Sequence, residues 1–311
     1  MPPKPQNLII SAPVQAALSN DKPVVALEST VLTHGLPYPD SLKILRELER
    51  LIESAGAVPA TIIVWQGEAR VGLDEELVEA LEPALRKGGA FRKLGRRDLP
   101  LAMASGYSGG TTVSGTMLLA WQAGIEVFAT GGIGGVHQGW GETLDISSDL
   151  SALAQIPVTV VSAGCKAILD IAATLEYLET LAVPVLGWQV DRFPLFYTRD
   201  SDYRIDPIDS LEQFAAFHRH HSDLGGGGIL VANPIPAADS IPALHLTSDI
   251  QAGIVTAKVQ GIGGKELTPF LLDFLAQHTK GESVRANLAL LKNNALLAAK
   301  LAGALKGRTE A

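Results

Sequence analysis

Residues 125–166 read IEVFATGGIGGVHQGWGETLDISSDLSALAQIPVTVVSAGCK, and their pattern indicates the fold class. It begins with a buried β-rich run, IEVFAT (125–130), and closes with a second one, VTVVSAG (158–164). Between them TGGIGG (130–135) lets the backbone turn sharply and approach a ligand closely, because glycine tolerates positive φ and has no side chain. In open α/β sheets, ligands bind where the strands end. The stretch therefore predicts an α/β fold with a small-molecule site beside the glycines.

Similar β-rich runs alternate with helical stretches along most of the chain. The other runs are VVALEST (24–30), ATIIVW (60–65), VPVLGW (183–188) and GILVAN (228–233). Helices are expected over 40–55, 74–85, 111–123, 167–181 and 283–305. This alternation predicts a single α/β/α layered domain with a mainly parallel central sheet, spanning residues 1–311. The less regular stretch 191–207 is either a loop that folds over the site or a plain surface loop.

The composition limits the classes of partner. The chain has 25 Lys and Arg against 33 Asp and Glu, a net charge of -8, which argues against a broad nucleic-acid surface but leaves room for a local basic pocket. Cys165 is the single cysteine, so it cannot form an internal disulfide. No apolar run reaches the roughly 18 residues of a membrane span, and the first residues lack the apolar core of a secretory signal. We therefore expect a cytoplasmic protein without nucleic-acid or membrane partners.

Lys166 is the most informative single residue. It follows the run VTVVSAG and stands where the helix over 167–181 is expected to begin. The positive end of the helix dipole disfavours an ammonium group there, whereas a lysine nucleophile needs its neutral amine. The alternative is a surface lysine on the first turn of a helix. The neighbouring Cys165 is expected to be a small buried hydrophobic residue without a catalytic role, since no histidine lies near it in the sequence.

Glu28 stands at the end of the run VVAL, where a carboxylate can face a pocket as a general acid or base. The ordinary interpretation is a glutamate that caps a helix or forms a salt bridge. The string STVLTHGLPYP (29–39) favours the functional interpretation, because it supplies several polar side chains before two prolines stiffen the turn. His34 in this string is, taken alone, a structural histidine.

Two segments could bind a phosphate group. KLGRRD (93–98) concentrates three cations, among them Lys93, in an otherwise acidic chain, and is either a solvated surface turn or an anion site. Thr111, Thr112 and Val113 stand at an expected helix start, where backbone N–H groups and hydroxyls can donate to the same anion. Together the two segments predict a phosphate site.

The acidic run after the glycines offers oxygen ligands. Asp145, Ser147 and Asp149 alternate, so on an extended segment they would point to one side and converge on a divalent cation or on sugar hydroxyls. The alternative is helix capping by Ser147, Ser148 or Asp149, and we expect that role for at least one of them. A dinucleotide-binding fingerprint fails, because His137 stands where the third glycine belongs. Oxygen ligands alone would favour Mg²⁺ or Mn²⁺ over Zn²⁺.

Long motifs along the chain carry a family resemblance. They include VVALESTVLTHGLPYP (24–39), GAVPATI (56–62), RRDLP (96–100), TTVSGTM (111–117), FATGGIGGVHQG (128–139), ETLDISSDL (142–150), SAGCKAILD (162–170), FPLFYTR (193–199), VANPIP (231–236), GKELTPFLL (264–272) and ANLALLKNNA (286–295). With these motifs the chain resembles the pseudouridine-5′-phosphate glycosidases, also called the indigoidine synthase A-like group. The resemblance extends over a core of about residues 24–301.

The resemblance implies an activity and its residues. The family reversibly cleaves the C–C glycosidic bond of pseudouridine 5′-phosphate with water, giving uracil and ribose 5-phosphate, and uses Mn²⁺, one per subunit, with Mg²⁺ as an alternative. Its members are homotrimers, and a separate pseudouridine kinase is the implied pathway partner. Carried onto this chain, Lys166 opens the ribose and forms a Schiff base, and Glu28 donates the proton. The metal ligand is Asp145, and the substrate-binding residues are Lys93, Thr112, Val113, Thr130, His137, Ser147, Ser148, Asp149 and Asn287.

Two departures from the family pattern are visible, and neither removes an assigned role. The chain has KLGRRD where the family reads closer to KVSRRD, and Cys165 where a small residue such as alanine is common. Two alternatives to the leading hypothesis stay open. One keeps the lysine chemistry but replaces uracil with another heterocycle, and the other is a sugar-phosphate-binding regulatory module without turnover.

Overall fold

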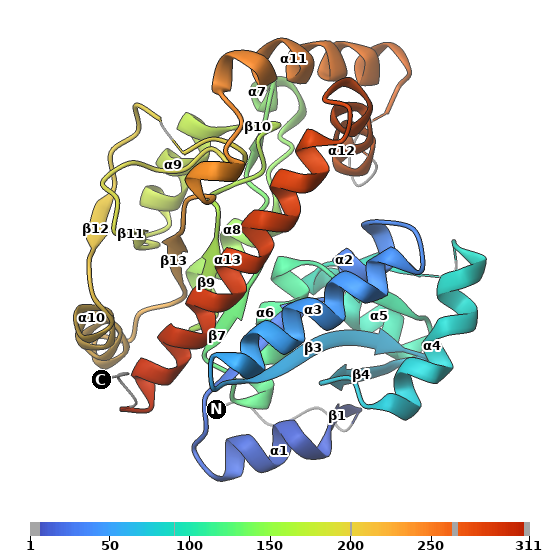
Figure 1. Ribbon diagram of the computed structural model, residues 1–311, viewed down its shortest axis with the longest axis vertical. Helices are drawn as coiled ribbons and strands as arrows, with labels where there is room; N and C mark the ends of the chain where they lie inside the picture. The colour runs from blue at the N-terminus through green and yellow to red at the C-terminus, as the bar shows by residue number, and fades with distance from the viewer. Residues whose placement is uncertain (1–6, 90, 200, 263–266, 308–311) are drawn as a thin grey trace.

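The computed structural model describes residues 7–89, 91–199, 201–262 and 267–307, and the start of the motif GKELTPFLL lies outside these ranges. One large sheet runs through the described chain (Figure 1). Across it the strands follow the order β1 (Leu8–Ile10), β4 (Glu68–Val71), β3 (Val58–Trp65), β2 (Val24–Glu28), β7 (Val127–Ala129), β9 (Thr159–Ser162), β13 (Ile229–Ala232), β11 (Val185–Trp188) and β12 (Asp206–Ile208). Off this path, β6 (Gly109–Thr111) pairs with β3, and β5 (Arg92–Leu94) pairs with β6.

All six β-rich runs expected from the sequence are strands of this sheet. From β3 through β2, β7, β9, β13 and β11 to β12, every neighbouring pair is parallel. Antiparallel pairing joins β3 to β4 and to β6. The mainly parallel sheet is therefore confirmed. Its register places Leu27 opposite Ala129 and Ala129 opposite Val161, so the residues that follow these positions end up at one edge of the sheet.

The antiparallel pair β3 and β4 was not expected from the sequence. Gln66 and Gly67 form the two-residue turn between them, with φ of 51° and 82°. Two consecutive residues with positive φ match the right-handed twist of a tight hairpin, and glycine supplies one of them without strain. The pair Gln66-Gly67 between two β-rich runs was the available signal.

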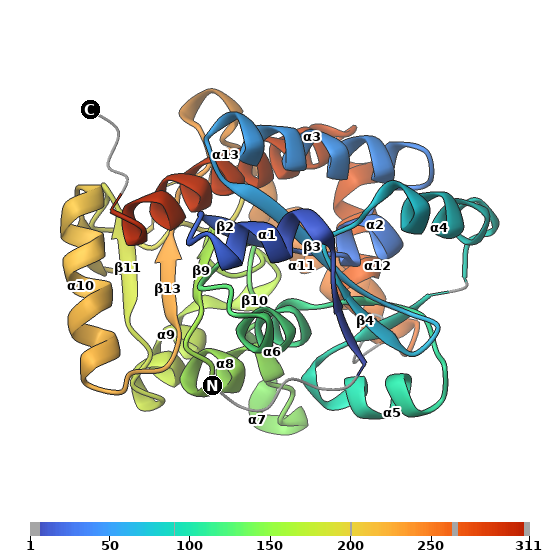
Figure 2. The ribbon, with the colours of Figure 1, turned by 90° about the horizontal axis from the view of Figure 1, so that it is seen from below.

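Helices cover both faces of the sheet. They are α1 (Ala12–Ser19), α2 (Thr30–His34), α3 (Asp40–Ser54), α4 (Glu75–Lys87), α5 (Leu99–Ala104), α6 (Val113–Ala123), α7 (Trp140–Thr143), α8 (Ser148–Gln155), α9 (Ile171–Thr180), α10 (Leu211–Asp223), α11 (Ala243–Val259), α12 (Leu267–His278) and α13 (Glu282–Leu305). Figure 2 shows α3 and α13 on one face, with α6 and α8 on the other. This is the α/β/α layering that the sequence predicts. The helices α3, α4, α6 and α13 match their expected ranges closely.

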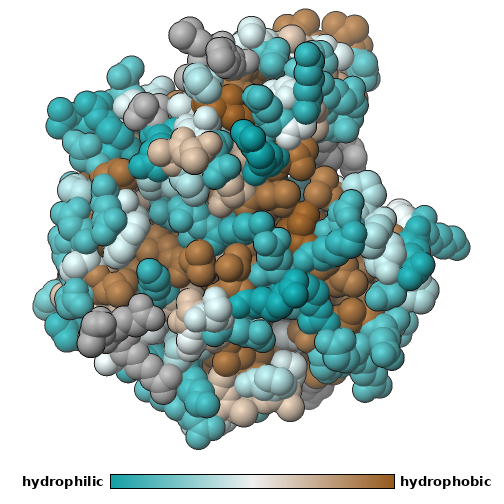
Figure 3. All heavy atoms as spheres, viewed as in Figure 1, coloured by the Kyte–Doolittle hydropathy of each residue, from teal (hydrophilic) through white to brown (hydrophobic). Residues whose placement is uncertain are grey.

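Helix α13 is the long helix of the core. It packs on α3, α10 and α12 and on the strands β2, β7 and β9. By length and composition alone it could cross a membrane, but 56% of its apolar 18-residue stretch is buried inside the protein, as expected for a core helix. On the face that it crosses, apolar residues show between polar ones (Figure 3). Its apolar stripe therefore serves the core.

The helix expected over 167–181 begins later than predicted. Helix α9 starts at Ile171, and the carboxylate of Asp170 caps it by accepting the N–H of Ala173 at 3.0 Å. The preceding residues form a short strand, β10 (Leu169–Asp170), which pairs antiparallel with β8 (Val136–His137). This pairing and the Asp170 cap move the helix start beyond the position expected from the sequence.

Candidate active site

The glycine loop, residues 130–137, is the centre of the candidate site. It lies against the chain that follows β9, where Ala163 donates its N–H to the carbonyl of Gly131 at 2.9 Å and Ile133 donates to Gly164 at 3.1 Å. The backbone N–H of Lys166 donates to the carbonyl of Ile133 at 3.1 Å. These bonds fix the backbone of Lys166 beside the loop.

The loop needs glycine for close packing. A Cβ on Gly132 would lie 2.6 Å from the ring of Phe196, and one on Gly134 would lie 2.2 Å from the hydroxyl of Ser147. Neither glycine has a positive φ. The sequence interpretation was therefore right about close approach, whereas the sharp left-handed turn that it allowed is not used at these positions.

Glu28 ends β2 and is 9% exposed. The hydroxyl of Thr130 donates to Oε1 of its carboxylate, and the hydroxyl of Thr30 donates to Oε2. Thr130 is 1% exposed and follows β7, the parallel neighbour of β2. Two threonines thus orient one carboxylate at the edge of the sheet where the glycine loop begins.

Two asparagines behind this edge were not predicted as site residues from the sequence. Asn294 of α13 donates from Nδ2 to the carbonyl of Thr130 at 2.8 Å, and its Oδ1 accepts from Nδ2 of Asn233 at 3.0 Å. Both asparagines are buried, at 0% and 4% exposure. Asn287, the expected site asparagine, lies beside Gly131, the residue after Thr130, and its Oδ1 is 3.5 Å from where a Cβ on Gly131 would stand. The signal for Asn294 was a polar pair, Asn293-Asn294, within an apolar helix.

Lys166 does not open a helix, and that prediction is wrong. It lies in the turn before β10, where the N–H of Leu169 donates to its carbonyl at 3.0 Å, and α9 begins only at Ile171. The helix-dipole argument for its neutral amine therefore falls. Its position beside the glycine loop is what now connects Lys166 with the other candidate residues.

His137 shows that several candidate residues lie close together. Burial lowers the pKa of its imidazole, Asp145 acts in the opposite direction, and the cations of Lys166 and Lys93 lower the pKa further. His137 is thus within electrostatic reach of three candidate residues that come from different parts of the chain. Its backbone N–H donates to the carbonyl of Asp145 at 3.1 Å. The lowered pKa favours a neutral imidazole, which can accept a hydrogen bond as well as donate one.

Asp149 joins the glycine loop to helix α6. It is 5% exposed, and its two carboxylate oxygens accept the N–H groups of Gly134 and Ser114, each at 2.9 Å. Residues 145–147 are extended and pair with the glycine loop, where the N–H of Ser147 donates to the carbonyl of Gly135 at 3.0 Å. Asp149 lies in the first turn of helix α8, which Ser147 caps by accepting the N–H of Asp149 at 3.2 Å. The expected capping role is therefore confirmed for Ser147, whereas Asp149 lies on the helix and not on the extended segment.

The start of α6 is only partly available to an anion. Ser114 gives its N–H to Asp149, and Thr111 uses its N–H and hydroxyl for Ser29 and Ile62, at 3.0 and 2.7 Å. The hydroxyl of Thr112 lies 3.3 Å from that of Ser114, which lies 3.1 Å from that of Ser148. The hydroxyls of Thr112, Ser114 and Ser148 therefore form a row beside the start of α6, which we call the hydroxyl ladder.

The segment KLGRRD is partly a site segment and partly a solvated surface turn, the two interpretations that the sequence allowed. Lys93 lies on β5 and acts on His137 electrostatically, as a site residue would. The guanidinium of Arg96 donates to Gln155 at 2.6 Å, and the Arg97 side chain is 81% exposed. The segment thus contributes Lys93 toward the site and leaves Arg97 in solvent.

A divalent metal has one candidate ligand here. No group of three His, Cys, Asp or Glu side chains that could hold a metal ion occurs in the described part of the chain. Asp145 is half-buried beside His137. Mg²⁺ and Mn²⁺ are hard cations, and sites for Mg²⁺ commonly use one or two carboxylates plus water and substrate phosphates. The residues present fit such an ion and do not form a closed protein cage.

The loop over 191–207 packs on the site. Its Phe196 lies against Gly132, and the N–H of Phe196 donates to the carbonyl of Ala163 at 3.0 Å. The guanidinium of Arg192 donates to the carbonyl of Asp202 at 3.2 Å, and that of Arg199 donates to the carbonyl of Ile235. This loop therefore covers Gly132 of the glycine loop. Arg192 bonds to the loop's own backbone, and Arg199 ties the loop to the segment that follows β13.

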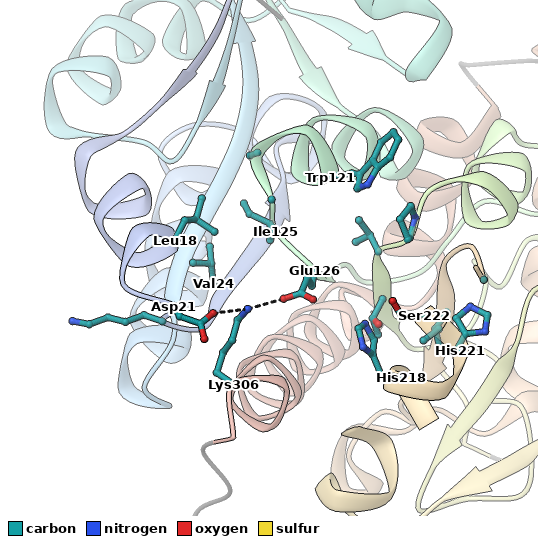
Figure 4. A pocket seen from close by; sticks show the side chains of 18 of the residues that line it. Leu18, Asp21, Val24, Trp121, Ile125, Glu126, His218, His221, Ser222 and Lys306 are labelled. Carbon is teal, nitrogen blue, oxygen red and sulfur yellow. Dashed lines mark hydrogen bonds and ion pairs between the residues drawn. The ribbon is translucent and has the colours of Figure 1, made fainter. Parts of the chain in front are cut away.

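A cavity of about 590 Å³ lies elsewhere, at the amino ends of the strands (Figure 4). It is lined by the first residues of β2, β9 and β13 and by helix α10, so it lies opposite Glu28 and Thr130. Lys306 reaches into it and pairs with Asp21 and Glu126. None of the candidate site residues lines this cavity.

Comparison with known proteins gives consistent matches over the whole fold. A family model described as "Indigoidine synthase A like protein" matches residues 13–304. The pseudouridine-5′-phosphate glycosidase of Methylobacterium nodulans is 51% identical over 306 residues, covering 97% of this chain and 90% of its own. The enzyme of the same name from Geobacillus kaustophilus is 47% identical, covering 95% and 97%.

Two solved structures share the fold. The prealnumycin C-glycosynthase AlnA in complex with ribulose 5-phosphate superposes with a TM-score of 0.89 at 36% identity, covering 97% of this chain and 98% of its own. An indigoidine synthase A-like protein from Thermotoga maritima gives a TM-score of 0.86 at 35% identity, covering 96% of both chains.

Proposed function

This chain is an enzyme of the indigoidine synthase A-like family, and we propose that it reversibly cleaves the C–C glycosidic bond of pseudouridine 5′-phosphate to uracil and ribose 5-phosphate. One observation carries the proposal. The glycine loop brings an oriented carboxylate, Glu28, and a lysine, Lys166, to the same end of the sheet. The matched glycosidases, which are more identical to this chain than the C-glycosynthase is, support uracil as the base.

A C–C glycosidic bond has no leaving oxygen to protonate, so the two-carboxylate strategy of ordinary glycosidases does not serve it. We propose that the amine of Lys166 attacks the anomeric carbon, and that the ring oxygen leaves with a proton from Glu28. The attached nitrogen passes a proton back to the Glu28 carboxylate, which regains its acid form. The nitrogen lone pair then forms an iminium as the bond to uracil breaks, and the bonding pair left on the uracil carbon takes the proton from Glu28. Water hydrolyses the iminium, which releases ribose 5-phosphate and restores the lysine.

The other expected residues receive supporting roles in this proposal. Lys93, the hydroxyl ladder from Thr112 to Ser148, Val113 and Asn287 would bind the substrate. Asp145 would hold Mn²⁺, or Mg²⁺ in its place, and the bound ion would supply positive charge beside the anionic substrate. The trimer that the resemblance implies is also part of this proposal.

We propose that the reaction takes place in the cytoplasm and that a separate pseudouridine kinase supplies the phosphorylated substrate. Phosphate recognition at the site would require that earlier phosphorylation step. This pathway role comes from the resemblance and is part of the proposal.

The direct test is uracil release from pseudouridine 5′-phosphate with Mn²⁺, run beside an EDTA-treated sample and the Lys166→Ala variant. Release by the wild type that fails in both controls supports the reaction, the metal and the nucleophile together. Release by Lys166→Ala at the wild-type rate would remove the lysine from the mechanism.

A second enzyme function shares the fold and the lysine. The neighbouring structure binds ribulose 5-phosphate and is named a C-glycosynthase, so a different heterocycle could replace uracil. Offering ribose 5-phosphate with uracil or with other heterocycles separates the two, because only the proposed function makes pseudouridine 5′-phosphate. A regulatory module that only binds sugar phosphates would give no product with either.

A further inference from the structure

Helix α13 carries an asparagine at a position where packing alone would favour an apolar residue. Asn294 is fully buried, and its neighbours along the helix include the buried Leu290, Leu291 and Leu297. Burying an amide is costly unless each of its polar groups is hydrogen-bonded. The bonds that Asn294 makes therefore indicate what the residue is for.

The amide of Asn294 has partners on both sides. Its Nδ2 donates to the carbonyl of Thr130 at 2.8 Å and to that of Gly131 at 3.4 Å. Carbonyls only accept hydrogen bonds, so Nδ2 must face them and Oδ1 must face the other way. There it accepts from Nδ2 of Asn233 at 3.0 Å, while the backbone N–H of Asn233 donates to Ser162 at 2.8 Å. The amide orientation is thus fixed by the bonding pattern.

These bonds end at the proposed acid. Thr130 is held at its carbonyl by Asn294 and at its N–H by the carbonyl of Val161, 3.0 Å away. Its hydroxyl donates to Oε1 of Glu28. We propose that Asn294 is a positioning residue for Glu28, acting through Thr130 and touching no substrate itself. The hydrogen-bonded path from Asn294 through Thr130 to Glu28 is called the relay below. The inference rests on the proposed function, because it assigns Glu28 the role of acid and base.

The neighbouring asparagine offers a matched control. Asn293 also donates to a backbone carbonyl, that of Pro234 at 3.0 Å, but its bond does not lead to Glu28. Asn293→Leu and Asn294→Leu therefore each remove one amide from the same helix. Only the second removes a contact to Thr130.

The experiment compares kcat and KM for uracil release in the wild type, Asn293→Leu, Asn294→Leu, Thr130→Val and the double variant Asn294→Leu/Thr130→Val. We expect Asn294→Leu to lower kcat by about 10- to 100-fold, since small displacements of a catalytic group cost about that much. Its KM should stay within about threefold. Asn293→Leu should keep kcat within about threefold. The double variant should be no slower than the slower single one, because both changes break the same relay.

Each outcome bears on a different claim. If the wild type releases uracil and the variants Asn293→Leu and Asn294→Leu have equal kcat, the relay is overturned and the proposed function stands. The same holds if the loss of kcat in the double variant is the product of the losses in the two single variants. If Asn294→Leu does not fold, as judged by its thermal melt, Thr130→Val decides: unchanged kcat overturns the relay. If the wild type releases no uracil and forms no borohydride-stable adduct with ribose 5-phosphate, the proposed function falls and the relay with it.

Discussion

Cys165 lies next to the proposed nucleophile, yet its surroundings make its thiol inert. The side chain is fully buried, and burial raises its pKa to about 12. A thiol reacts as its thiolate, and an ordinary cysteine has a pKa near 8.5, so the native protein should react roughly 1000-fold more slowly than a free thiol at pH 8. Iodoacetamide labelling followed by mass spectrometry checks this. Because the chain has one cysteine, urea-unfolded protein is the full-labelling control, and equal rates in both samples would contradict the assignment.

Single residues differ in how visible their roles are in a sequence. Glu28 could be singled out because it ends an apolar run, and parallel register does place such ends together. Asn294 could not, because a pair of polar residues within an apolar helix does not reveal the partners of either one. Those partners, Thr130 and Asn233, lie 164 and 61 positions away in the chain. Only the packing of α13 on the strands brings them together.

Among the elements, the glycine loop and α6 are joined by one carboxylate. Asp149 satisfies the N–H groups of Gly134 and Ser114, and both bonds are buried. In Asp149→Asn, the amide nitrogen takes the place of one carboxylate oxygen. It then faces a backbone N–H group, which loses its acceptor. Leaving a buried donor unsatisfied costs about 1–3 kcal/mol, so the free energy of unfolding should fall by that amount. Urea unfolding at neutral pH measures it, with the half-buried Asp145→Asn as control. Equal stability of the two variants would contradict this role of Asp149.

Element boundaries were predicted well only where a local pattern determines them. Apolar periodicity placed α3 and α13 within a residue or so of their ends, since that period reflects the face each helix buries. The start of α9 was wrong because β10 forms by pairing with β8, a contact that no local pattern encodes. The error matters, since it removes the helix dipole from the explanation of Lys166.

Over the whole molecule, Lys306 ties the end of α13 to two earlier parts of the chain. Its ammonium lies 2.9 Å from a carboxylate oxygen of Asp21 and 2.8 Å from one of Glu126. Burial opposes the charge of Lys306, but the hydrogen bonds to Glu126 and Asp21 outweigh it and raise the pKa above the ordinary 10.5. A raised lysine pKa means that the stabilisation is complete at neutral pH. It is lost only as the pH rises beyond 10.5 toward the folded-state pKa.

Lys306→Met should therefore lower the free energy of unfolding by about 1 kcal/mol at low salt, which is modest because such pairs are partly solvated. The loss should be the same at pH 7 and pH 9 and smaller at high salt. Uracil release should be unchanged, because Lys306 lies at the opposite end of the sheet from Glu28. Lys300→Met, an exposed lysine on the same helix, is the control for denaturant unfolding. A large fall in activity without a fall in stability would contradict this assignment.

The architecture of the whole molecule was largely predictable. The α/β/α layers and the mainly parallel sheet followed from six β-rich runs that alternate with helices. The short strands β5 and β6 were not predictable, because three-residue strands carry no periodicity of their own. One domain over residues 1–311 stays a prediction, as does the trimer.

Lys166 is proposed to form a covalent link to the sugar phosphate. Borohydride reduction of the wild-type protein with ribose 5-phosphate, followed by peptide mass spectrometry, traps this link if it forms. We predict one stable adduct on the peptide that contains Lys166, and none in the Lys166→Ala variant. An unmodified Lys166 in protein that releases uracil, or an adduct on Lys93 instead, would contradict the account.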